Sequence, residues 1–379
     1  MPMHNGWLPR EGLTGDPIGR FIKRTALNPT LTLAIILLAR YTKKGSDLSI
    51  IHEKAFGRIK ALFYFSLIRL VSNYLDAGAL DNWTVDKYDW KKEIVLITGG
   101  AGGIGGNVVK LLAEKRIKVV VLDVIPMTFE TPSNVYYYQC DITSPSTISS
   151  VASEIRKDVG DPTIIINNAG VARGKQILDA TEKDVRFTFD VNTLAHYWIA
   201  KEFVPSLVKH NHGMVVTVAS LAAYVTVPNM VDYAASKAAA LSFHEGLTAE
   251  LTTRYNAPKV RTVVVNQGYT KTPLFQGYYN EAQFLVPTLE PETVAEAIVK
   301  QVLSGSSGQI ILPGFAALFT LFKGFPHWYQ IRTRAKGEKI MKKWHGRQVI
   351  DVENWKVDKG KEKEVAESAS TVLVPPAEQ

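Results

Sequence analysis

Cysteine is almost absent from this chain of 379 residues, which contains Cys140 alone. A single thiol excludes an intrachain disulfide, so burial and hydrogen bonding must hold the fold, and a reducing compartment is the natural setting. We interpret Cys140 as a small buried residue at the end of a strand rather than as a nucleophile.

The sequence also lacks an apolar run near its N-terminus that could cross a bilayer upright. The uncharged window there, residues 25–39, has fifteen residues and contains Pro29, whereas an upright helical span needs about 20. No small-x-small cleavage site follows the window, which argues against a secretory signal.

Acidic residues are scarce in two flanking segments of the chain. Residues 1–60 hold ten Lys or Arg against four Asp or Glu, and residues 320–350 hold eight against Glu338 alone. The net charge is +8, so these flanks carry +13 and the remainder about −5. Because the basic residues alternate with Leu, Ile, Phe and Trp, an anionic membrane surface fits them better than nucleic acid does.

Three flanking segments combine apolar and basic residues: 25–39 with Lys and Arg on both sides, 55–75 as an amphipathic helix, and 315–347, where aromatic residues precede a basic run. Rings beside ammonium groups are typical of interfacial anchors. We therefore predict attachment to a membrane or lipid-droplet surface. Packing over the core or in a dimer interface remains an alternative.

The chain divides into four parts by composition. We place an N-terminal membrane-associating extension at residues 1–90, a catalytic domain at 91–313, a helical aromatic and basic extension at 314–355, and a disordered polar tail at 356–379.

The central part alternates short β-branched runs with helix-length segments. Alternation of this kind implies βαβ units, and runs that are apolar on both faces imply helices on both sides of the sheet. We predict an α/β fold, a Rossmann-type doubly wound parallel sheet of about seven strands. The expected strands are 94–97, 118–122, 135–139, 163–166, 214–218, 260–265 and 309–312.

The first predicted strand runs into a glycine loop, Gly99 to Gly105, and then a helix, residues 107–116. Glycine lets the backbone approach a pyrophosphate, and the free N–H groups of a helix start favour an anion. Asp123 ends the second strand about 20 residues later, where a carboxylate accepts from a ribose 2′-hydroxyl and repels a 2′-phosphate. The sequence therefore favours NAD over NADP as cofactor.

Several motifs in one order give the segment 93–275 its resemblance to the short-chain dehydrogenase/reductase family. Thr98, Gly99, Gly103 and Gly105 match the glycine motif, and residues 167–170 match the Asn-Asn-Ala-Gly motif. Tyr233 and Lys237 match the Tyr-x-x-x-Lys signature, and Ser220 precedes Tyr233 by thirteen residues. One departure lies after the sixth strand, where Gln267 replaces the usual proline and Thr270 an aliphatic residue.

The resemblance implies a set of site residues. The catalytic group is Asn192, Ser220, Tyr233 and Lys237, in which Asn192 holds a water of the proton relay. Among the cofactor residues, Asp141 contacts the adenine. The cofactor residues are Thr98, Gly99, Gly103, Ile104, Gly105, Asp123, Asp141, Ile142, Asn168, Ala169, Gly170, Tyr233, Lys237, Thr270 and Thr272.

A phenol with a pKa of about 10 is a poor base at neutral pH. Lys237 lies one helical turn beyond Tyr233, so we expect its positive charge to favour the phenolate. Ser220 at a strand end can orient the substrate oxygen. The histidines His196, His210, His212 and His244 have no metal-ligand spacing, and we predict no metal site.

The flanks resemble by architecture the membrane- or lipid-droplet-associated retinol and 17β-hydroxysteroid dehydrogenase branch, which implies an endoplasmic reticulum or lipid-droplet location facing the cytosol and a homodimer. With an apolar lid containing Leu274 and Phe275, we predict interconversion of a lipophilic alcohol and its carbonyl. An NADPH-dependent biosynthetic reductase and a lipid-surface scaffold without turnover remain alternatives.

Overall fold

The computed structural model describes residues 3–275, 278, 280 and 282–342. The predicted tail at 356–379 and residues 343–355 of the predicted C-terminal extension lie outside this range.

A seven-stranded parallel sheet forms the centre of the fold, with the strand order β3-β2-β1-β4-β5-β6-β7. The predicted Rossmann-type sheet is thereby confirmed, and the strands lie within two residues of their predicted ends. The order reverses between β1 and β4, so the cleft above their carboxyl ends is where such a sheet binds ligands. The strands are β1 (Ile94–Thr98), β2 (Lys118–Asp123), β3 (Val135–Gln139), β4 (Ile164–Asn167), β5 (Met214–Val218), β6 (Arg261–Gln267) and β7 (Gly308–Leu312).

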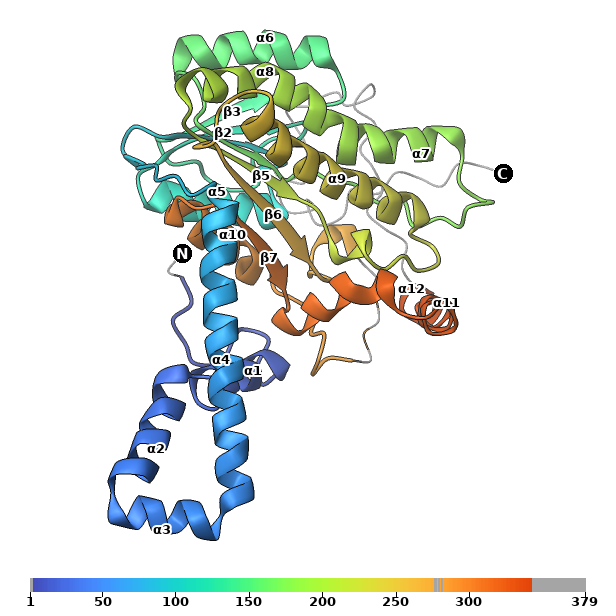
Figure 1. Ribbon diagram of the computed structural model, residues 1–379. Helices are drawn as coiled ribbons and strands as arrows, with labels where there is room; N and C mark the ends of the chain where they lie inside the picture. The colour runs from blue at the N-terminus through green and yellow to red at the C-terminus, as the bar shows by residue number, and fades with distance from the viewer. Residues whose placement is uncertain (1–2, 276–277, 279, 281, 343–379) are drawn as a thin grey trace.

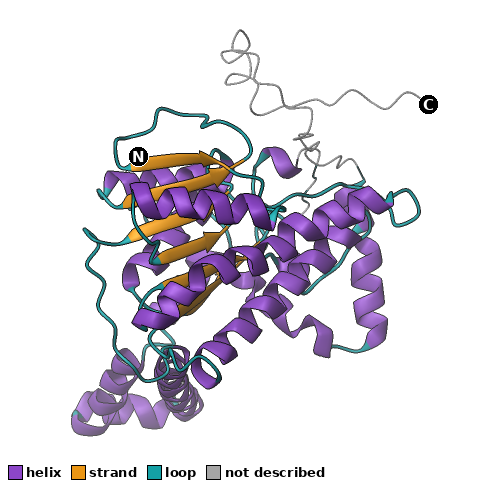
Figure 2. Cartoon of the chain, turned by 90° about the horizontal axis from the view of Figure 1, so that it is seen from above, coloured by secondary structure: helices purple, strands orange, loops and turns teal. Residues whose placement is uncertain are grey.

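Helices cover both faces of the sheet, as the view from above shows (Figure 2). On one face α5 (Gly103–Glu114) and α10 (Pro291–Ser304) enclose an apolar cluster with alternate strand residues. On the other, α6 (Pro145–Asp158), α8 (Ala195–His210) and α9 (Val231–Thr253) enclose a second cluster. Apolar side chains on both faces of each strand explain why the sheet needs both layers.

The helical segment that contains Asn192 consists of two helices joined by a π-helical turn. The turn η1 (Asp190–Leu194) separates α7 (Glu182–Phe189) from α8. π turns of this kind insert one extra residue and are common at functional sites. Two short 3₁₀ helices, η2 (Leu221–Ala223) and η3 (Pro273–Phe275), follow β5 and β6.

The N-terminal extension folds into α1 (Gly15–Arg24), α2 (Pro29–Tyr41), α3 (Lys43–Ile51) and α4 (Glu53–Leu80). The last three form a helical hairpin that projects away from the catalytic domain (Figure 1). Among the described helices, none alone is long and apolar enough to span a membrane; α1 and α2, bent by 44° at the break between them, reach that length and composition only as a pair.

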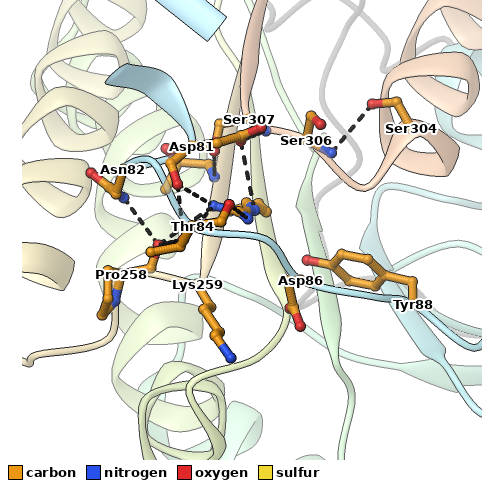
Figure 3. Close-up of polar contacts among 12 residues, drawn as sticks. Asp81, Asn82, Thr84, Asp86, Tyr88, Pro258, Lys259, Ser304, Ser306 and Ser307 are labelled. Atoms are coloured by element: carbon orange, nitrogen blue, oxygen red, sulfur yellow. Dashed lines mark hydrogen bonds and ion pairs between the residues drawn. The ribbon is translucent and has the colours of Figure 1, made fainter. Parts of the chain in front are cut away.

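A polar latch joins the end of α4 to the starts of β6 and β7 (Figure 3). The guanidinium of Arg261, on β6, donates to the carbonyls of Asp81 and Thr84, at 2.7 Å each. The Asp81 carboxylate accepts from the Ser307 N–H at 2.7 Å, and the Asn82 amide donates to the Pro258 carbonyl. These contacts fix the hairpin at the amino ends of β6 and β7, opposite the ligand cleft at the carboxyl ends of the strands.

The C-terminal extension returns towards the cleft through the 3₁₀ helix η4 (Gly314–Gly324), α11 (His327–Lys336) and α12 (Glu338–Met341). The Asp16 carboxylate, on α1, accepts from the N–H groups of Gly314 and Phe315 at 2.8 and 3.0 Å. This carboxylate satisfies donors at the start of η4, so the two extensions meet. Their apolar residues therefore belong to adjoining surfaces.

Candidate active site

A cavity of about 450 Å³ lies above the carboxyl ends of the strands. All but two of the predicted site residues line it, although they come from loops, helices and a strand end spread over residues 99–275. The exceptions, Thr98 and Asn192, are buried behind its wall. Those that line it are Gly99, Gly103, Ile104, Gly105, Asp123, Asp141, Ile142, Asn168, Ala169, Gly170, Ser220, Tyr233, Lys237, Thr270, Thr272, Leu274 and Phe275.

The glycine loop leaves room for a pyrophosphate at the start of α5. Gly99 has a φ of +66°, and a Cβ there would lie 2.8 Å from the Ala169 Cα; a Cβ at Gly105 would lie 2.1 Å from the Gly99 carbonyl oxygen. Gly102 provides no side-chain cap to α5, so the first N–H groups of the helix face the cavity without intrahelical acceptors. The loop thus fits the diphosphate of a dinucleotide.

Thr98 acts behind the loop rather than in the cavity. Its hydroxyl oxygen accepts from the backbone N–H groups of Asn168 and Ala169, both at 3.1 Å. In return the Asn168 amide donates to the carbonyls of Thr98 and Gly99 at 3.0 Å. Thr98 and Asn168 therefore hold the loops after β1 and β4 together across the switch point.

Asp123 has a role that the sequence did not reveal. One carboxylate oxygen accepts from the Ala101 N–H at 2.9 Å, and the other accepts from the Val124 N–H at 2.8 Å. The same carboxylate that lines the cavity therefore also fixes the glycine loop. Asp141 is held in a similar way by the N–H and the hydroxyl of Thr143.

Ser220, Tyr233 and Lys237 meet at the other end of the cavity. The Ser220 hydroxyl is close enough to the Tyr233 phenol to oppose the rise of its pKa, and the Lys237 ammonium lies 5.9 Å from the centre of the Tyr233 ring. Lys237 donates to the Val218 carbonyl at 2.8 Å. A substrate oxygen at this point can contact both hydroxyls, with a cation one helical turn away.

Burial dominates the electrostatics of this group. It raises the pKa of Tyr233 to about 12, although the hydrogen bond from Ser220 opposes the shift. It also lowers the pKa of Lys237 to about 8. The expected lowering of the phenol pKa by Lys237 is therefore outweighed in the cofactor-free protein, because a buried anion loses its hydration.

Asn192 sits in the π turn and is fully buried. Its amide accepts from the Val171 N–H and donates to the Val171 carbonyl, both at 2.8 Å, and donates to the Ser236 hydroxyl at 2.9 Å. Both amide N–H donors are therefore occupied by protein acceptors. The side chain ties the loop after β4 to α9.

The wall beside Tyr233 is apolar and aromatic. Phe275 packs edge-on against the Tyr233 ring, with centroids 5.6 Å apart, and its carbonyl accepts from the Tyr269 hydroxyl at 2.7 Å. Sequence reasoning missed the residues that loop 225–230 and α12 pack against Tyr233 outside the cavity lining, since no motif marks them. The cluster around Tyr233 is Ala172, Ala222, Val227, Met230, Ala234, Leu274, Phe275, Tyr278, Ile340 and Met341.

A glycine loop at the start of a helix and a Tyr-Lys pair across the same cleft define a nicotinamide-dependent oxidoreductase of the Rossmann type. Residues 93–283 match the family described as short chain dehydrogenase. The chain belongs to that family. It is an NAD(P)-binding oxidoreductase that acts on CH–OH groups, as its sequence predicted.

Relatives agree with the predicted branch. The chain is 46% identical to Dehydrogenase RED2 of Cochliobolus heterostrophus over 198 residues, which cover 52% of this chain and 75% of that one. It is 35% identical to rat estradiol 17-beta-dehydrogenase 11 over 239 residues, 61% and 78% of the two chains. Human 17-beta-hydroxysteroid dehydrogenase 13 is 32% identical over 245 residues, 62% and 79%. The predicted 17β-hydroxysteroid dehydrogenase branch is thereby confirmed.

Solved structures share the fold. A short-chain dehydrogenase from Streptomyces avermitilis superposes with a TM-score of 0.54 at 20% identity, over 66% of this chain and 97% of that one. A 4-hydroxyisoleucine dehydrogenase complexed with NADH gives a TM-score of 0.53 at 20% identity, over 59% and 97%.

Proposed function

We propose that this enzyme interconverts a lipophilic alcohol, of the retinol, steroid or long-chain type, and its carbonyl compound. The observation that carries the proposal is the apolar lining of the cavity that holds Tyr233, to which Phe187, Leu274 and Phe275 contribute. Apolar lining with a few polar groups suits a hydrophobic ligand that is oriented at one oxygen. The rat relative is named an estradiol 17-beta-dehydrogenase.

Tyr233 is the acid and base of the proposed mechanism. In the oxidative direction its oxygen takes the hydroxyl proton of the alcohol, and in the reductive direction it gives that proton back. Ser220 donates to the substrate oxygen and holds it beside the phenol. Lys237 in its protonated form favours the phenolate. A bound nicotinamide supplies the hydride acceptor or donor.

We further propose NAD as the preferred cofactor, because the Asp123 carboxylate lines the cavity beside Val124 and Ile125. A negative charge at this place accepts from a ribose 2′-hydroxyl and repels a 2′-phosphate. NADP and a reductive role in a biosynthetic pathway are the alternative.

The hairpin supports attachment to a membrane or lipid-droplet surface, with the catalytic domain on the cytosolic side. Its helices expose large apolar side chains, including Leu38 at 59% and Ile68 at 68%. η4 and α11 expose Leu321 and Trp328 on the other extension. Apolar residues exposed on this scale mark an interaction site, and the interspersed Lys and Arg suit anionic headgroups.

A homodimer is the proposed assembly. A groove of about 590 Å³ lies between α8 and α9 and is lined by Tyr197, Val204, Phe243 and Leu247 with other residues of these helices. An apolar groove between two long neighbouring helices can pack against the same groove of a second copy that is related by a twofold axis.

Turnover of retinoids, steroids and fatty alcohols with NAD and NADP, measured with and without vesicles, tests the function. Tyr233→Phe should lower kcat by about 10²- to 10⁴-fold. Tyr88→Phe is the matched control, because it removes the hydroxyl of a half-buried tyrosine, which donates to the Gly213 carbonyl away from the cavity lining. Turnover of small polar alcohols alone would refute the lipophilic substrate, and no turnover at all would favour the scaffold.

Vesicle flotation tests the attachment separately. The paired substitution Leu38→Glu and Ile68→Glu should release the protein from anionic vesicles, since it places charges on the exposed hairpin surface. Leu178→Glu is the control, because Leu178 is 96% exposed on the catalytic domain. Equal flotation of both variants would exclude the hairpin as the membrane contact.

A further inference from the structure

The ring of Phe275 lines the cavity and packs edge-on against Tyr233, with the two ring planes at 87°. Tyr233 is 2% exposed, and burial is the main cause of the raised pKa of its phenol. A ring in contact with a phenol displaces water from it, and loss of water disfavours the charged phenolate. The position of Phe275 therefore influences the electrostatics of the catalytic group.

Phe275 lies in η3, a helix of only three residues. Its N–H donates to the Thr272 carbonyl at 3.0 Å. A turn of this length is marginal by itself, because it fixes several backbone dihedrals for few hydrogen bonds. Contacts from outside the turn must therefore help to hold the Phe275 ring in place.

Tyr269 supplies such contacts from behind the cavity wall. Its hydroxyl donates to the Phe275 carbonyl at 2.7 Å, and its ring lies edge-on to the Phe275 ring with centroids 5.5 Å apart. The Tyr269 ring also stacks on Tyr278, with centroids 3.5 Å apart. The described residues that line the cavity do not include Tyr269, so it acts on the site through a neighbour such as Phe275.

The backbone around Tyr269 is itself anchored by pairing with residues 289–290. The Tyr269 carbonyl accepts from the Leu289 N–H, and the Lys271 N–H donates to the Leu289 carbonyl, each at 2.9 Å. Leu289 is buried in the cluster under α10, and the Lys271 ammonium pairs with the Glu290 carboxylate. Tyr269 is thus a fixed support for η3, because both its backbone and its ring are held.

We propose that Tyr269 is a positioning residue of the reaction, which holds Phe275 edge-on against Tyr233 and so keeps water from the phenol. The catalytic proton then passes between the phenol and the substrate oxygen, and exclusion of water prevents its loss to solvent. The inference rests on the proposed role of Tyr233 as acid and base, and not on the lipophilic substrate.

A ¹³C NMR titration of the full cofactor-free chain, labelled at tyrosine Cζ, tests the proposal without turnover. The Tyr233 signal is the one that disappears in Tyr233→Phe. Burial raises the pKa of Tyr233 to about 12, so the wild-type phenol should be largely neutral at about pH 10.5. Tyr269→Phe removes only a hydroxyl, and water admitted beside the phenol should lower the Tyr233 pKa towards its ordinary value of about 10. Lys237, the titratable group beside the phenol, is the same in both proteins.

A double-mutant cycle shows whether Tyr269 acts through Phe275. Phe275→Ala should lower the Tyr233 pKa by itself, and addition of Tyr269→Phe should lower it no further, because the ring that it positions is gone. Tyr88→Phe is the matched control, since its hydroxyl also donates to a backbone carbonyl, and it should leave the Tyr233 pKa unchanged. The NAD affinity of Tyr269→Phe should stay within about twofold, because the backbone pairing of Tyr269 remains.

An unchanged Tyr233 pKa in Tyr269→Phe would overturn the proposal, whatever its NAD affinity. A second fall of this pKa when Tyr269→Phe is added to Phe275→Ala would also overturn it. If Phe275→Ala is poorly folded, Phe275→Val takes its place in the cycle, since its shorter side chain also uncovers the phenol. Turnover of decan-1-ol by Tyr233→Phe at the wild-type rate would refute the proposed role of Tyr233 instead, while the titration still decides that of Tyr269.

Discussion

The latch that joins the helical hairpin to the catalytic domain gives a prediction whose size follows from its geometry. Arg261 is 2% exposed, and its guanidinium is the donor to the carbonyls of Asp81 and Thr84. Arg261→Met keeps the unbranched stem but leaves both carbonyls without this donor. A hydrogen bond from a charged group contributes about 1.5–3 kcal/mol, so loss of these two costs about 3–6 kcal/mol. We expect segment 81–87 and the end of α4 to open before the sheet unfolds, because local units open independently.

Hydrogen exchange of residues 81–90 and thermal unfolding measure this effect. Exchange of that segment should accelerate strongly in Arg261→Met and less in Arg261→Lys, which keeps a charge but not the two-pronged donor. NAD affinity should be unchanged, because six strand residues, roughly 20 Å, separate Arg261 from the cavity end of β6. Wild-type exchange in segment 81–90 of Arg261→Met would refute the assignment of the latch, and so would loss of NAD binding with the latch intact.

Three further predictions concern the cavity, its electrostatics and the assembly. Asp123→Ala should move the ratio of the NADP to the NAD dissociation constant towards unity by about tenfold. The ratio is measured because loss of the Ala101 contact weakens the binding of both cofactors. An unchanged ratio would show that Asp123 does not distinguish NAD from NADP. Burial lowers the pKa of Lys237 from 10.5 to about 8, so between these values the unfolded chain binds the extra proton. Relative to Lys237→Met, the free energy of unfolding of the wild type should therefore rise between pH 8 and 10.5 by up to about 3 kcal/mol. Urea unfolding of the cofactor-free proteins at pH 7, 9 and 10.5 measures this difference. A difference that does not change with pH would contradict the lowering of the Lys237 pKa by burial. Gly246 lies in the groove between α8 and α9, and a Cβ there meets no atom within 4 Å. Gly246→Arg should therefore leave the monomer folded and prevent the proposed dimer, whereas Gly246→Ala should not; sedimentation of both variants decides.

Regular elements of the catalytic domain could be predicted from local pattern. Strands such as β4 and β5 are apolar on both faces, a property that each segment carries in its own residues. The glycine loop was equally readable, because Gly99 and Gly105 are required by steric contacts of the backbone itself. The π turn at Asn192 was not, since its extra residue is stabilised by contacts with Val171 and Ser236 from distant segments.

By itself, the sequence determined the class of sheet, the cofactor loop, the members of the Ser220, Tyr233 and Lys237 group, and the apolar, basic character of both ends. Only the tertiary structure decided how these parts act on one another. Burial sets the protonation of Tyr233 and Lys237, and Arg261 fixes where the hairpin projects. Whether a polar side chain such as Tyr269 finds a partner depends on every neighbour in the folded cavity, because hydrogen bonding and desolvation are properties of the assembled site rather than of a segment.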